Sequence, residues 1–113
     1  MSRLALGLGL VLAGCGATGA MEKPAPRQGV TFTPDAQGLG IENSAMRVDF
    51  GRSPKGVIPV MTREMGEGKT LALTGCPVGV VQQIEWDGLT LSFTSERFVG
   101  WKSATARAGQ SCA

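Results

Sequence analysis

Few residues of this 113-residue chain have the chemistry of a catalytic group, because it contains no histidine and no tyrosine. Without histidine, the usual general base near neutral pH is missing, and Ser-His-Asp and Cys-His catalysis are excluded. Glu85, Asp87 and Glu96 lie in the same predicted sheet, and paired carboxylates can act as acid and base in glycoside hydrolysis. The polar face of a strand explains Glu85 and a turn explains Asp87, so we predict no catalytic residues and no enzyme.

A glycine motif of the form G-x-G-x-x-G covers Gly14 to Gly19. Such glycines bind a dinucleotide when they open a helix whose N-terminus holds the pyrophosphate. Pro24 and Pro26 follow closely and exclude that helix. The rest of the chain is also too short for repeated βαβ units of about 30 residues each. A dehydrogenase is therefore the weakest alternative function, and no cofactor is predicted.

An apolar run of ten residues, 4–13, follows a single positive charge at Arg3. Ten helical residues span about 15 Å, which is half of a bilayer core. The run is therefore typical of a signal-peptide core and not of a membrane-spanning helix.

Cys15 closes the run in the tetrad Leu-Ala-Gly-Cys, which resembles a bacterial lipobox. The resemblance implies that residues 1–14 are a lipoprotein signal peptide and that Cys15 carries a diacylglyceryl group, so that membrane lipid is its partner. Gly16, where an inner-membrane protein of this class has Asp, implies the outer membrane with the domain facing the periplasm. An ordinary cleaved signal peptide with a chance cysteine is the alternative.

The other two cysteines, Cys76 and Cys112, are predicted to form a disulfide in the oxidising periplasm. Closing a loop of this length contributes roughly 4 kcal/mol in the chain-entropy account. A redox site would need Cys-x-x-Cys, which the chain lacks. Two free thiols or an intermolecular bond are the alternatives.

Trp86 and Trp101, on neighbouring predicted strands, are the largest side chains. Aromatics at such positions usually build a core, but an exposed pair would form a docking surface. With Arg97 and Lys102 they make a possible binding surface for another envelope component. The net charge of +2 is too small to indicate nucleic acid. Met46, Met61 and Met65 have ligand chemistry for Cu(I), although core packing explains their spacing, and no metal site is predicted.

The elements that must position these residues begin after a small, proline-bearing stretch. We expect residues 15–38 to form a lipidated flexible tether, residues 39–103 a small α+β domain, and residues 104–113 a tail stapled by the disulfide. The expected fold is one short helix on an antiparallel sheet of three or four strands. One strand is predicted before the helix, at 46–50, and the sheet after the helix has strands at 70–74, 80–86, 89–93 and 97–102. Residues 30–33 alternate apolar and polar side chains, as in a short strand.

The helix is predicted to follow Ser53-Pro54, an N-cap with proline in the first turn, and to end at Gly66. Pro59 removes a backbone hydrogen bond inside this helix, which leaves a start near Ile58 or a kink as alternatives. Asp87-Gly88 is a strong signal for a two-residue hairpin.

The stretch from Met46 to Lys102 resembles small proteobacterial envelope lipoproteins of unknown function. The shared features are a strand ending in Asp-Phe-Gly-Arg, a helix, a turn that contains a cysteine, and the patterns W-x-G-L-x-L-x-F and R-F-x-G-W. A looser similarity is to outer-membrane-assembly lipoproteins of the SmpA/OmlA type, which place two helices before a strand meander. That family opens with G-x-[ST]-x-x-[EQ]-V, whereas this chain has Gly56 at the acidic or amide position.

These resemblances imply a non-catalytic lipoprotein that acts as a small binding or interaction module, with an envelope protein as a possible partner. A periplasmic ligand or metal binder is the alternative.

Overall fold

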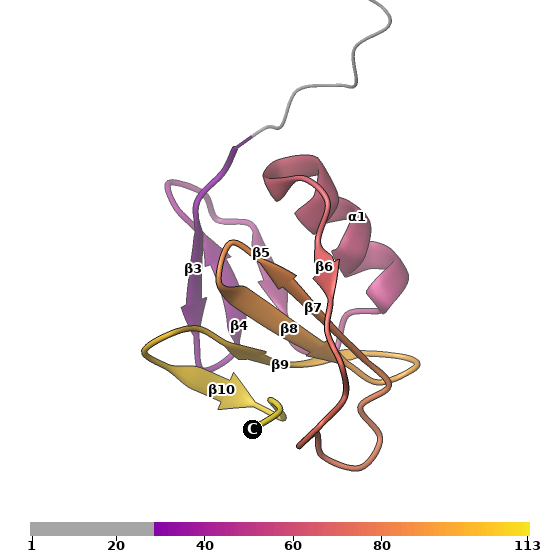
Figure 1. Ribbon diagram of the computed structural model, residues 1–113. Coiled ribbons are helices and arrows are strands. Elements are labelled where there is room, and N and C mark those ends of the chain that lie inside the picture. Colours follow the sequence, from indigo (N-terminus) through magenta and orange to yellow (C-terminus); the bar gives the residue numbers. More distant parts are fainter. Residues whose placement is uncertain (1–28) are drawn as a thin grey trace, which may run out of the picture.

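The computed structural model describes residues 29–113, in which one helix packs with two antiparallel sheets (Figure 1). The small sheet has the order β3-β4-β5 and the large sheet the order β10-β9-β8-β7-β6. The predicted α+β class is confirmed, but the sheet of three or four strands is wrong, since there are five strands in one sheet and three in a second. The elements are β3 (Phe32–Asp35), β4 (Gly38–Ile41), β5 (Arg47–Asp49), α1 (Pro54–Met65), β6 (Lys69–Thr70), β7 (Gln82–Trp86), β8 (Leu89–Phe93), β9 (Phe98–Lys102) and β10 (Arg107–Gly109).

Ordered structure extends beyond the expected domain on both sides. Strand β3 lies inside the range 15–38 that the sequence assigned to the tether, and its partner β4 begins at Gly38. Strand β10 and the buried Cys112 lie inside the expected tail of residues 104–113. Strands are thus present before residue 39 and after residue 103, where the short segments carry little hydrophobic pattern. The predicted signal peptide and Cys15 lie outside the described residues.

Helix α1 begins at Pro54 and not near Ile58. The Ser53 hydroxyl accepts a hydrogen bond from the Gly56 backbone N–H at 3.2 Å, which satisfies one donor of the first turn. Val57 and Met61 are buried, whereas Pro59 faces solvent. The buried contacts of Val57 and Met61 and the Ser53 cap therefore stabilise the helix, although Pro59 cannot donate a backbone hydrogen bond.

The large sheet is built around the predicted hairpin. Asp87 and Gly88 both have positive φ, 50° and 83°, as a two-residue turn with left-handed central residues requires. The turn pairs Trp86 with Leu89 and so fixes the register of β7 against β8. The sequence prediction of this hairpin is confirmed.

The hydrophobic core lies on one face of the large sheet. Register places Ile84, Leu91 and Trp101 side by side on that face. Val57 and Met61 of α1 and Leu39 and Val48 of the small sheet belong to the same buried cluster. The helix and the small sheet therefore share one apolar face of the large sheet.

The opposite face is covered in part by the C-terminal segment, residues 110–113. Ser92 of β8 is 1% exposed although it faces away from the core, and the Cys112 sulfur lies 4.0 Å from its hydroxyl. A Cβ at Gly100 would lie 2.5 Å from the Gln110 backbone, so the segment approaches closely where β9 has no side chain. Strand β8 is consequently buried on both faces.

None of the helices within residues 29–113 is long and apolar enough to cross a membrane.

Candidate functional site

The two tryptophans predicted for a docking surface are buried, with Trp86 3% and Trp101 5% exposed. The Trp86 indole N–H donates to the Gly66 carbonyl at 2.9 Å, and the indole packs against Gly68, where a Cβ would lie 2.5 Å from it. The Trp101 indole N–H donates to the Asp35 carbonyl at 2.7 Å. The two tryptophans therefore take the core positions that aromatics usually occupy and do not form the alternative docking pair, because each indole finds a backbone partner inside the fold.

The two basic residues of that surface lie at opposite ends of β9. Arg97 is exposed in the turn before the strand. Lys102, the last residue of β9, is half-buried and donates to the C-terminal Ala113 at 3.3 Å. The four residues do not form one binding surface.

Cys76 and Cys112 form a disulfide, as predicted. Two hydrogen bonds lie next to the bridge. The Ala113 N–H donates to the Gly75 carbonyl at 2.9 Å, and the Arg107 guanidinium donates to the Cys112 carbonyl at 3.4 Å. The bridge therefore fastens the C-terminal segment to the loop between β6 and β7.

The other chemistry-bearing side chains are dispersed. Glu85 accepts a hydrogen bond from the Gly88 N–H at 3.2 Å and supports the hairpin turn. Met61 lies in the core and Met46 is exposed, so these two thioethers do not meet. Within residues 29–113, no group of three or more His, Cys, Asp or Glu side chains is arranged to hold a metal ion.

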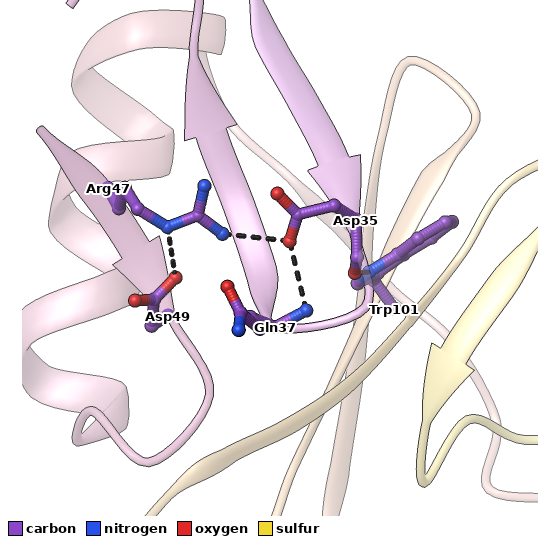
Figure 2. A network of polar contacts seen from close by, with 5 residues as sticks. All are labelled: Asp35, Gln37, Arg47, Asp49 and Trp101. Carbon is purple, nitrogen blue, oxygen red and sulfur yellow. Dashed lines mark hydrogen bonds and ion pairs between the residues drawn. The ribbon is translucent and has the colours of Figure 1, made fainter. Parts of the chain in front are cut away.

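A polar network crosses the outer face of the small sheet (Figure 2). The Arg47 guanidinium donates to Asp35 Oδ1 at 2.8 Å and to Asp49 Oδ1 at 2.7 Å. The Gln37 backbone N–H donates to the same Asp35 oxygen at 2.9 Å. Arg47 pairs with Gly40 on β4, and the missing side chain there lets the guanidinium cross to β3. The network thus ties both outer strands together over the central one.

The electrostatics of this network favour its charged form. The hydrogen bond from Arg47, followed by the one from the Gln37 backbone, lowers the pKa of Asp35 below its ordinary value. The pKa of Arg47 is raised by its bonds to Asp35 and then Asp49. Because the shifts of Asp35 and Arg47 both favour the charged pair, the arrangement stabilises the sheet and is not poised to transfer protons.

A cleft of about 540 Å³ lies on the described part of the chain and is here called the N-terminal cleft. Its walls come from the start of the described chain, the end of α1, the β7–β8 turn and the turn after β9. The apolar lining residues are Val30, Phe32, Pro34, Met65 and Leu89, and the remaining ones include Asp87 and residues 103–105. A cleft of this size with apolar walls falls within the usual range of ligand sites, about 300–1,000 Å³.

Glu64 binds the start of the described chain, which forms one wall of the N-terminal cleft. Its backbone carbonyl accepts from the Gly29 N–H at 3.2 Å, and its carboxylate accepts from the Val30 N–H at 3.3 Å. The carboxylate is also paired with Arg63 at 3.0 Å, which accounts for a charged residue that is only 6% exposed. The described chain therefore begins beside the cleft, at the end of α1.

Sequence reasoning missed both the network and the cleft. The alternation of Gly38 and Gly40 with apolar residues in β4 was a usable signal, since it leaves one face of the strand without side chains. The cleft had no such signal, because its walls come from four separate segments.

No family model matches the chain, and neither a curated protein nor a solved structure is found to be similar to it.

Proposed function

We propose that this protein is a non-catalytic lipoprotein of the bacterial envelope, anchored in the outer membrane through Cys15. Its domain faces the periplasm and acts as a small binding module.

The observation that carries this proposal is the Cys76–Cys112 disulfide. Structural disulfides persist in oxidising compartments such as the periplasm. With two of the three cysteines joined inside the domain, Cys15 is left for the lipid that its lipobox-like tetrad implies.

The N-terminal cleft replaces the tryptophan pair as the proposed binding surface. It is open and apolar, and it adjoins the point where the chain continues towards Cys15. The same cleft favours a second candidate, a periplasmic ligand binder that is released from the membrane after ordinary signal cleavage.

Mass spectrometry of the native N-terminus, with a Cys15→Ser variant as control, tests the proposal. We expect the wild-type chain to begin at an acylated Cys15 and to fractionate with the outer membrane, and the variant to lose the acyl mass. A chain that is cleaved elsewhere and recovered in the soluble periplasm without acylation would support the released ligand binder instead. Without reductant, the mass should also be two hydrogens below that of the dithiol form.

A further inference from the structure

The N-terminal cleft lies within reach of any group attached to Cys15. Gly29, the first described residue, lies 14 positions after Cys15 in the chain. Such a segment spans at most about 50 Å when fully extended, and about 20 Å on average for the flexible tether that the sequence predicts. A group on Cys15 would therefore meet the cleft as an intramolecular ligand, at an effective concentration in about the millimolar range.

The lining of the cleft suits an uncharged apolar chain. Val30, Phe32, Met65 and Leu89 supply aliphatic and aromatic surface, and Asp87 is the charged residue among those that line it. A fatty-acid carboxylate or a phospholipid phosphate near Asp87 would meet repulsion between like charges. The acyl groups of a lipidated cysteine are joined through neutral ester and amide bonds and carry no such penalty.

We propose that the N-terminal cleft binds one acyl chain of the lipid on Cys15 of the same molecule. This inference rests on the proposed function, because it requires that Cys15 be acylated.

Whether the cleft holds the acyl chain depends on whether the protein is in water or inserted in a membrane. In water, each methylene that the cleft removes from solvent contributes about 0.8 kcal/mol. In a bilayer the same chain is already surrounded by hydrocarbon, so this gain disappears. The cleft therefore shelters one acyl chain while the protein is outside a membrane and releases it when the protein inserts.

Photocrosslinking of the whole processed protein tests this. Cells are fed a fatty acid with a diazirine in its chain, and the protein is extracted, diluted below the critical micelle concentration of the detergent and irradiated. We expect crosslinks from the Cys15 lipopeptide to peptides containing residues 30–34, 65, 87–89 or 103–105, and their loss after insertion into vesicles.

Two variants of exposed alanines provide a matched pair. Ala104 lines the cleft and Ala72 lies outside it. Ala104→Trp should reduce cleft crosslinks about tenfold, which corresponds to about 1.4 kcal/mol, whereas Ala72→Trp should leave them unchanged. Equal crosslinking in both variants would overturn the proposal.

The failures are distinguishable. If the wild type takes up no diazirine label at Cys15, the proposed function fails, and this inference fails with it. If the label is present and is lost in Cys15→Ser, but crosslinks fall outside the cleft, the inference alone is overturned. Phospholipid joined to cleft residues, or transfer of label to added ¹⁵N-labelled Cys15→Ser protein, would show that the acyl chain comes from another molecule and would also overturn it.

Discussion

The two faces of the five-stranded sheet are covered in different ways. On one face, Leu89, Leu91 and Phe93 of β8 contribute to the buried cluster shared with α1 and the small sheet. On the other face, Ser92 of the same strand lies under the C-terminal segment, and the neighbouring Gln83 has a buried Oε1 without a hydrogen-bond partner within the described chain. On the apolar face, the helix and the small sheet are held against the large sheet because their packing removes hydrocarbon from water. On the polar face, burial gives little hydrophobic stabilisation, and the C-terminal segment is held there by the Cys76–Cys112 disulfide.

The comparison shows how a small domain can bury a central strand on both sides. A second apolar face would have required a second layer of apolar side chains, which a domain of this size can barely supply. Instead, the C-terminal residues cover Ser92 and the β6–β7 loop contacts Gln83, and one disulfide joins these two segments.

Phe93→Ala should have the largest effect on stability, because Phe93 is fully buried on the apolar face and contacts Phe98 at a ring-centroid distance of 5.7 Å. We expect a loss of about 3–5 kcal/mol in the free energy of unfolding, measured by urea denaturation. The exposed Val78→Ala is the matched control and should change little. A loss below about 1 kcal/mol for Phe93→Ala would show that the apolar face is not the main source of stability.

Removing the Cys76–Cys112 disulfide should have the next largest effect on the free energy of unfolding. The double variant Cys76→Ser, Cys112→Ser should lose about 2–4 kcal/mol, since the unfolded chain is no longer constrained by a bridge between residues 36 apart. Hydrogen exchange should become faster at the β10 amides while those of β7 and β8 stay protected. Uniform loss of protection across both regions would contradict the separation of the two faces.

Gly100→Ala tests the close approach of the C-terminal segment to β9. The added methyl would clash with the Gln110 backbone, and we expect a loss of about 1–3 kcal/mol. In the double cysteine variant the segment can move aside, so the same substitution should cost less. Equal cost in both backgrounds would show that the disulfide does not hold the segment on the sheet. Gly56→Ala, at an open helical position, is a control expected to stabilise by up to about 1 kcal/mol.

The exposed network on the small sheet should have the smallest effect, and one that depends on pH. The pKa of Asp35 is lowered in the folded state, so its ionised form stabilises the fold above the unfolded value of about 3.9, and this contribution is lost as pH falls through the folded pKa. Asp35→Asn should therefore lower the thermal midpoint slightly at pH 7, with the difference from wild type vanishing in acid. Glu42→Gln is the control for general charge effects. A difference that grows on acidification would contradict this assignment.

The sequence predicted the parts of the fold that rest on local chemistry. The cap at Ser53, the stop at Gly66, the Asp87-Gly88 turn and the cysteine pairing all depend on a few residue types with strong preferences. The small sheet was predicted only in part, through strand 46–50 and the alternation at residues 30–33, because β3 and β4 are short and contain glycine and proline.

The burial of the tryptophans could not be predicted from local pattern. Trp101 reaches the Asp35 carbonyl, which is 66 residues away in the chain, and no periodicity identifies such a partner. The same applies to the N-terminal cleft, whose walls meet only after both sheets have formed. What remained hidden was the contact between distant segments, and that contact decides where a binding surface lies.

Pulled apart by its two ends, this domain would lengthen in a restricted way. The Cys76–Cys112 bond encloses strands β7, β8, β9 and β10 in one closed loop. At about 3.3–3.6 Å per extended residue, the residues inside this loop would add on the order of 120 Å to the extended length if the disulfide were absent. With the disulfide present, they do not bear the applied force. Tension applied between Gly29 and Ala113 would therefore unravel the small sheet and α1, and the hairpins inside the loop would not be drawn out.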